Sequence, residues 1–148
     1  MSILSFKYNP GSGPITSICV FPAEFDHEKE KILGKNNFFR GLLDTGADGT
    51  DISPNVVEKL KLNPIGKGEL GGVTGAKDVN VYAFRIGFVM GRTAVSSGVE
   101  TRIEGPQEIL RGHEFENHRT DFDVLIGRDI LCKGHFSMSY DGNCLFAW

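Results

Sequence analysis

The sequence predicts an all-β fold with one or two short helices. Apolar residues fall mostly in short runs rich in β-branched and aromatic side chains, and clusters of turn-forming residues separate these runs. Glycine accounts for 19 of the 148 residues, well above its usual share of about 7%, which indicates many turns and close backbone approaches. The length predicts a single domain, residues 1–148, that is large enough to bury a core of its own.

Strands and turns alternate through the first half of the chain. Strands are predicted at 3–8, 15–21 and 38–43. A dense turn signal lies at 9–14, and the charged stretch 26–31 is most simply a solvated loop or one helical turn. One helix is well marked, because Ser53 is a favourable N-cap residue and Pro54 suits the first helical position.

Hairpins are expected in the second half of the chain. Closely spaced glycines between 66 and 75 lead into the alternating residues 79–82, which predicts a glycine-rich hairpin that runs into a strand. Residues 91–121 are the least readable part, and only a strand at 108–110 is assigned there. A compact apolar strand is predicted at 122–126.

The C-terminal residues predict a further hairpin. Its strands are expected at 136–140 and 143–148, with Asp141-Gly142 between them in a type I′ turn. The sequence holds no internal repeat and no low-complexity tract.

Composition argues against several classes of protein. Sixteen Lys and Arg against 19 Asp and Glu give a net charge of −3, so we expect no nucleic-acid partner. No apolar run reaches the roughly 18 residues of a membrane span, and the first residues lack the pattern of a signal peptide, so we expect no membrane partner and a cytoplasmic location. Three cysteines without pair spacing (Cys19, Cys132 and Cys144) favour buried free thiols over disulfides. His113 and His118 are interpreted as surface residues, and neither a metal nor a cofactor is expected.

The segment most informative about chemistry begins at Asp44. A carboxylate just past an apolar strand, followed by Thr45 and Gly46, combines a buried approach, a hydroxyl that can hold the loop and a glycine that admits another backbone. One such carboxylate alone does little chemistry. Two that face each other share one proton, so one can take a proton from water while the other donates to a carbonyl oxygen.

Two simpler interpretations of this segment are a carboxylate that only stabilises a turn and a calcium-binding loop. In the first interpretation, Asp44 only stabilises a turn, as Asp residues in loops commonly do. This interpretation does not account for the second motif described below. A calcium loop would place Asp44, Asp48 and Gly49 at its first, fifth and sixth positions. That interpretation fails, because Gly46 and Asn55 stand where the loop needs a ligand and a glutamate, and because a strand precedes it.

Four segments carry a resemblance to a known family. They are Leu42–Asp48, Thr50–Pro54 with the helix after it, the hairpin Gly71–Gly75, and Val124–Leu131, which reads Val-Leu-Ile-Gly-Arg-Asp-Ile-Leu. Together they make the chain similar to the retropepsin-like (retroviral-type) aspartic proteases, including their free-standing bacterial and transposon relatives. The resemblance covers roughly residues 38–148. It implies a closed β-barrel, the single lobe of an acid protease, that functions as a two-fold dimer.

The resemblance also implies roles for individual residues. Asp44 is the catalytic aspartate, Thr45 interlocks two active-site loops, and Gly46 offers its carbonyl to the substrate backbone. Asp48 and Gly49 line the cleft. Two residues support the active-site loop from behind: Arg128, paired with Asp48, and Asp129. The flap that closes over bound peptide consists of Gly72, Val73, Thr74 and Gly75.

The single Asp-Thr-Gly decides the expected assembly. One copy in 148 residues cannot supply a dyad, so a homodimer with Asp44 facing Asp44 is expected, and the function predicted is that of an aspartic endopeptidase acting on peptide or protein substrates. Residues 2–8 and 145–148 are candidate dimer strands by analogy. The alternative function is a non-catalytic module that keeps this fold for dimerisation or peptide binding. For a catalyst an acidic optimum is expected, because the dyad must keep one proton.

Overall fold

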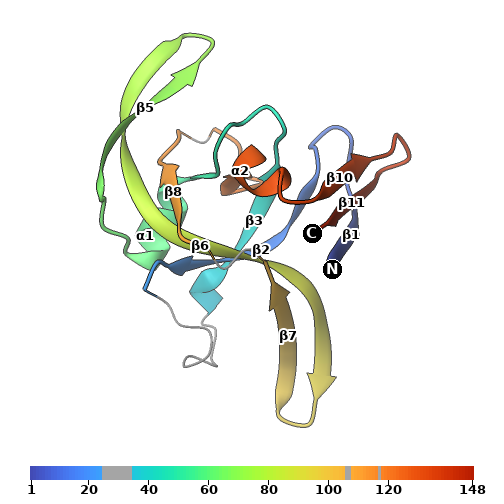
Figure 1. Ribbon diagram of the computed structural model, residues 1–148. Coiled ribbons are helices and arrows are strands. Elements are labelled where there is room, and N and C mark those ends of the chain that lie inside the picture. Colours follow the sequence, from blue (N-terminus) through green and yellow to red (C-terminus); the bar gives the residue numbers. More distant parts are fainter. Residues whose placement is uncertain (25–34, 106–107, 117) are drawn as a thin grey trace.

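The computed structural model describes residues 1–24, 35–105, 108–116 and 118–148 (Figure 1). The charged stretch 26–31 lies outside the described residues. The predicted all-β class is confirmed. The strands are β1 Ile3–Lys7, β2 Ile15–Pro22, β3 Phe38–Leu43, β4 Asp51–Ile52, β5 Gly66–Gly72, β6 Gly75–Val95, β7 Gly98–Glu104, β8 Leu110–His113, β9 Val124–Ile126, β10 His135–Met138 and β11 Asn143–Ala147. The helices are α1 Pro54–Leu60 and α2 Arg128–Leu131, with a 3-10 turn, η1, at Lys35–Asn37.

The main sheet is nearly closed, like a barrel. Within it, β9 lies next to β3, the strand that ends just before Asp44. Strands follow the order β4-β9-β3-β2-β6-β5, and β7 and β8 also pair with β6. β9 runs parallel to β3 and antiparallel to β4, so it lies between them. Leu43 and Ile126 are paired at the ends of β3 and β9. The loops that follow these two strands therefore start side by side.

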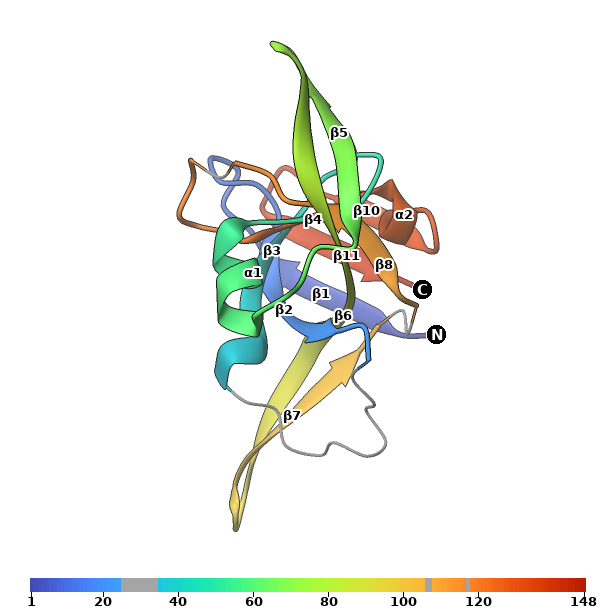
Figure 2. The same ribbon diagram turned by 90° about the vertical axis from the view of Figure 1, so that its left-hand side faces the viewer.

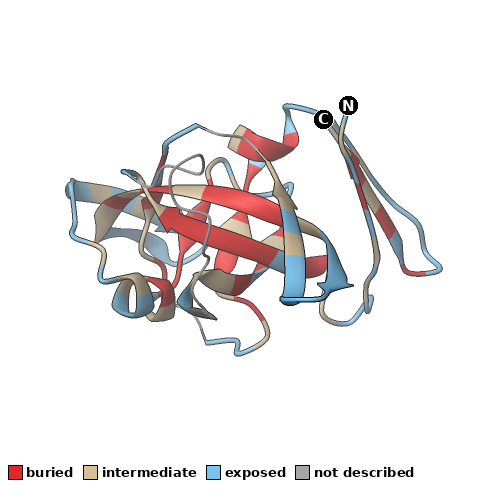
Figure 3. Cartoon of the chain, turned by 90° about the horizontal axis from the view of Figure 1, so that it is seen from below, coloured by how far each residue is buried: buried red, intermediate tan, exposed pale blue. Residues whose placement is uncertain are grey.

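The core fills the interior of this sheet. Buried residues alternate with partly buried ones in the middle of β6, as a half-buried strand requires, whereas β2 is buried along most of its length. The largest fully buried side chains are aromatic and β-branched, among them Phe21, Phe84, Phe88, Ile18 and Ile126. Figure 3 shows the buried residues gathered in the main sheet and the exposed ones towards the hairpins.

The terminal strands form a second, three-stranded sheet. β11 pairs with β1 on one edge and with β10 on the other, both antiparallel. Residues 2–8 and 145–148 are therefore strands, but they pair with each other inside one chain. This corrects the expectation for β11, which has no free edge to offer to a second copy.

β6 is the longest strand, and its end forms part of the segment 91–121, where the sequence predicted only one strand. It runs for 21 residues, pairs with β5 at its first half and with β7 at its end. Figure 2 shows these two hairpins projecting from opposite ends of the molecule. The predicted strand at 108–110 is shifted, because β8 begins only at Leu110. The β6–β7 hairpin was missed because residues 91–100 are all exposed, so they carry no apolar alternation.

Three local details also differ from the expectations. The helix follows Ser53 as predicted, but the Ser53 hydroxyl donates to Asp123 Oδ1 at 3.1 Å and makes no capping bond. The predicted strand at 122–126 begins only at Val124. The C-terminal turn is not type I′, since only Gly142 has positive φ (+85°) and not Asp141. Its geometry fits a type I turn followed by a glycine bulge. No helix among the described residues is long and apolar enough to cross a membrane.

Candidate active site

Asp44 is fixed at the end of β3 by its own loop. Its backbone N–H donates to the Ile126 carbonyl at 2.9 Å, which continues the β3–β9 pairing past the strand. The Gly46 N–H donates to Asp44 Oδ1 at 2.8 Å. The half-buried carboxylate is thus held by one oxygen, and Oδ2 has no hydrogen-bond partner among the described residues. It remains available to a ligand or a second chain.

A buried clamp holds the loop from behind. The Thr50 hydroxyl donates to Asp129 Oδ1 at 2.7 Å and accepts from the Gly127 N–H at 3.2 Å, while the Thr50 N–H donates to Asp129 Oδ2 at 2.9 Å. Thr50 is fully buried. A Cβ on Gly127 would lie 2.3 Å from the Gly49 carbonyl oxygen, so only glycine fits. Sequence reasoning named Asp129 but missed Thr50, whose burial has no signal in a single sequence.

The loop after β3 and the start of α2 are also joined at the surface. Arg128 pairs through its guanidinium with Asp48 Oδ1, and its backbone N–H donates to the Ala47 carbonyl at 2.9 Å. The Asp129 N–H donates to the Asp48 carbonyl at 3.2 Å. Figure 1 shows this loop beside α2. The structure thus brings Asp44, Asp48 and Arg128–Asp129 into one assembly.

The predicted flap residues lie at the tip of the β5–β6 hairpin. Gly75 adopts a φ of +116° that favours glycine, and Val73 and Thr74 form the turn before it. Val73 is fully exposed and faces solvent. Gly72, Thr74 and Gly75 line a pocket of about 450 Å³ that Asp44 does not line. The structure therefore does not bring the flap tip onto Asp44 within this single chain.

A small apolar cluster spans the distance between Asp44 and the hairpin. Its buried members are Ile15, Phe115 and Phe122, and partly buried Leu42, Leu70 and Leu125 pack against them. Leu42 lies two residues before Asp44, and Leu70 belongs to β5. The cluster therefore links β3, which ends one residue before Asp44, to β5 of the hairpin.

Asp51 and His113 form a second polar pair that sequence reasoning did not find. Asp51 Oδ1 accepts from the His113 N–H at 2.7 Å and lies 3.2 Å from His113 Nδ1. Burial raises the pKa of Asp51, and its contacts with His113 oppose that rise. His113 was expected at the surface but is half-buried. No group of three or more His, Cys, Asp or Glu side chains within the described ranges is arranged to hold a metal ion.

The cysteines take no part in this site. Burial raises the pKa of Cys19 to about 12 and that of Cys144 to about 11, so both thiols are unreactive near neutral pH. All three are free. Cys132, expected to be buried, is exposed, because it caps the end of α2 at the surface.

Comparisons with known proteins identify the fold. No family model matches the sequence, and no curated protein does. The structure is similar to that of a retropepsin-like aspartic protease from Rickettsia conorii, with a TM-score of 0.56, 14% identity and coverage of 98% of this chain and 89% of that chain. The chain has the fold of a retropepsin-like single lobe.

Two further solved structures are more distant. The EIAV protease, complexed with an inhibitor, gives a TM-score of 0.45 with 19% identity over 86% of this chain and 93% of that chain. A Legionella pneumophila protein of unknown function gives 0.34 with 13% identity over 82% of this chain and 85% of that chain.

Proposed function

We propose that this protein is an aspartic endopeptidase that acts as a homodimer, with one Asp44 carboxylate from each chain. One observation carries the proposal: Asp44 ends a buried strand on a braced loop and keeps one carboxylate oxygen without a partner among the described residues. The fold of the Rickettsia conorii protease supports it.

The reaction follows from two carboxylates that share one proton. The ionised carboxylate takes a proton from a water molecule, and the water oxygen bonds to the carbonyl carbon of the peptide. The other carboxylate gives its proton to the carbonyl oxygen. When the tetrahedral intermediate collapses, the C–N bond breaks and the amine leaves with the proton that the first carboxylate took from water, while a hydroxyl of the intermediate returns its proton to the second carboxylate. No covalent bond to the protein is needed.

Three other parts of the chain have roles in this proposal. Thr45 and Gly46 lie exposed beside Asp44, where Thr45 would contact the second chain and Gly46 the substrate backbone. Asp48 and Gly49, with Arg128 and Asp129 behind them, form the side of the cleft. The β5–β6 hairpin closes over bound peptide and excludes water.

Peptide cleavage read by mass spectrometry tests the proposal. Wild-type protein and Asp44→Asn are incubated with a mixed peptide library from acidic to neutral pH. We expect cleavage by the wild type alone, with a loss of at least about a hundredfold in the variant, since positioned acid–base groups contribute that much or more. Asp44→Asn should keep its circular dichroism and its oligomeric state. Equal cleavage by both proteins would remove Asp44 from the mechanism.

The alternative of a non-catalytic dimerisation or peptide-binding module makes the opposite prediction. Such a module would bind peptides or itself without cleaving them at concentrations where a dimer is demonstrated.

A further inference from the structure

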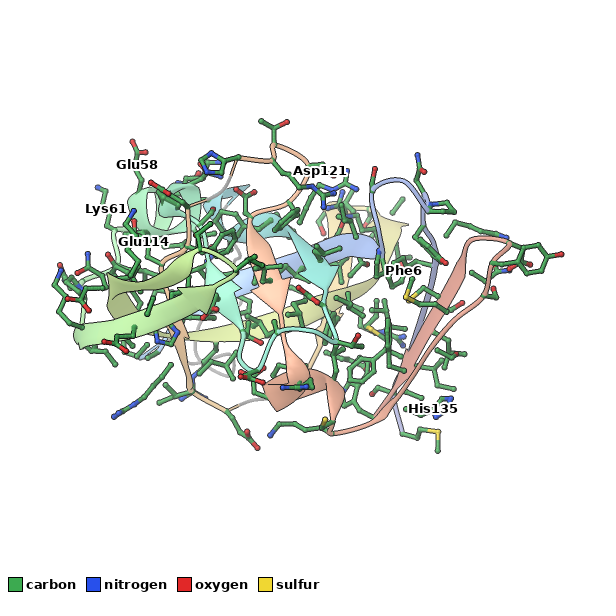
Figure 4. All side chains as sticks on the ribbon, turned by 90° about the horizontal axis from the view of Figure 1, so that it is seen from above. Phe6, Glu58, Lys61, Glu114, Asp121 and His135 are labelled. Carbon is green, nitrogen blue, oxygen red and sulfur yellow. The ribbon has the colours of Figure 1, made fainter. Side chains whose placement is uncertain are left out.

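The pocket beneath the β5–β6 hairpin has the size and the walls of a side-chain site. Its volume is about 450 Å³, within the range of about 300–1,000 Å³ typical of ligand pockets. Its lining comes from the hairpin, from Pro54 at the start of α1, and from residues 114–116 and 118 after β8. Figure 4 shows Glu114 between α1 and the hairpin.

This pocket is connected to the candidate active site. Leu70 and Phe115 line the pocket and also belong to the apolar cluster that includes Leu42, two residues before Asp44. An extended peptide placed across Asp44 and under the hairpin would pass along this cluster. One of its side chains would then reach the pocket.

The pocket contains one carboxylate that no cation neutralises. Glu114 Oε2 accepts from the Tyr82 hydroxyl at 3.1 Å and from Asn80 Nδ2 at 3.5 Å, and both donors are uncharged. The Glu114 backbone N–H donates to the Asn80 carbonyl at 3.0 Å, so the residue is fixed from both sides. Two basic residues line the pocket: Lys77 is paired with Glu116 at 3.3 Å, and no ion pair among the described residues joins His118 to Glu114. Among the described residues Glu114 therefore has no ion-pair partner.

We propose that this pocket is the subsite for a Lys or Arg side chain of the peptide substrate, with Glu114 as its charge partner. The proposal rests on the peptidase function proposed above. The apolar residues Leu70, Val79 and Phe115 would contact the aliphatic stem of such a side chain, and Glu114 would bind its cationic end. An acidic side chain is disfavoured by repulsion from the same carboxylate. A purely apolar one leaves Glu114 without a cation.

The test measures binding separately from cleavage. Fluorescent peptides that carry lysine, norleucine or glutamate at one position at a time are titrated into Asp44→Asn protein, which holds peptide without cutting it. The same peptides are offered to the wild type and their kcat/KM values are compared. At one position, lysine should exceed norleucine by about tenfold in both measurements, which corresponds to about 1.4 kcal/mol. Glutamate should be weakest.

Variants of Glu114 assign the effect to this side chain. Glu114→Gln should reduce the lysine preference to about twofold or less, and Glu114→Lys should reverse it in favour of glutamate. Glu69→Gln is the matched control, because Glu69 is exposed on the opposite face of β5 and does not line the pocket. It should keep the full preference. Thermal unfolding of each variant establishes that it is folded.

The outcomes separate the two proposals. Asp44-dependent cleavage without a lysine preference, or with one that Glu114→Gln leaves unchanged, overturns the subsite and leaves the peptidase intact. Glu114-dependent binding of lysine peptides without any cleavage overturns the peptidase and leaves the subsite. Failure to bind or to cleave any peptide overturns both.

Discussion

The loop after β3 and the tip of the β5–β6 hairpin are both rich in glycine, yet they use it in opposite ways. Around the loop, Gly127 is needed because the Gly49 carbonyl approaches where its Cβ would be. At the hairpin, a Cβ on Gly71 would meet no atom within 4 Å. The loop is also fixed by buried hydrogen bonds through Thr50, whereas the hairpin tip is exposed on all sides. The difference indicates a rigid platform for the carboxylate and a lightly supported hairpin tip.

The largest expected effect comes from filling the space at Gly127. Gly127→Ala should lower the free energy of unfolding by about 3 kcal/mol, because the new methyl group overlaps backbone that has no room to move. Gly71→Ala should change it by less than about 1 kcal/mol, and towards greater stability, since alanine restricts the unfolded chain. Urea unfolding measures both. Similar losses in the two variants would contradict the contrast between loop and hairpin.

Removal of the Thr50 hydroxyl is expected to have the next largest effect. Thr50→Val keeps the shape but leaves the buried Gly127 N–H without its acceptor and removes one of the donors to Asp129 Oδ1. We expect a loss of about 2 kcal/mol. Thr74→Val at the exposed hairpin tip serves as the control and should stay within about 0.5 kcal/mol of the wild type. If Thr50→Val changed the free energy of unfolding as little as this control, the Thr50–Asp129 contacts would not hold the loop.

The surface ion pair that also braces the loop should matter less. The Asp48 side chain is 90% exposed and that of Arg128 50%, so solvent screens their attraction. Asp48→Asn and Arg128→Gln, combined in a double-mutant cycle, should show a coupling energy below about 1 kcal/mol. A larger coupling would mean that the loop is held mainly from the surface and not by the buried Thr50–Asp129 contacts.

The smallest effect concerns the pH dependence of stability. Burial raises the pKa of Asp51 above its ordinary value of 3.8, so the folded state binds this proton more tightly than the unfolded state. The resulting stabilisation is fully present below 3.8 and is lost as the pH rises through the folded pKa. Asp51→Asn lacks this loss, so its stability relative to the wild type should increase across that window. Urea midpoints from pH 3 upwards measure it, and parallel curves would contradict the prediction.

Much of the fold followed from local patterns in the sequence. The strand at 38–43, the helix after Ser53 and the glycine-rich hairpin all carry short-range signals, namely apolar runs, an N-cap followed by proline, and closely spaced turn residues. The Asp48–Arg128 contact is present in the structure, although the two residues lie far apart in sequence. Only the resemblance to a family pointed to that contact.

The remaining features depend on tertiary contacts that no local pattern encodes. The outer part of the β6–β7 hairpin, residues 91–100, is exposed throughout, so burial imposes no apolar pattern on it. Thr50, Asp51 and Glu114 acquire their roles through partners on α2, β8 and β6, respectively. Cys132 is exposed because of where α2 ends. The roles assigned to Asp44 and its neighbours stay predictions until cleavage is measured.

The pairing of β1 with β11 sets a condition on any association between two copies. Because both strands belong to one chain, each meets the other at an effective concentration on the order of millimolar. A second copy at micromolar concentration cannot compete for the same edges, so exchange of β1 between chains is disfavoured. Two copies that place Asp44 opposite Asp44 would therefore meet through side chains and loops, or through the outer edges of this sheet.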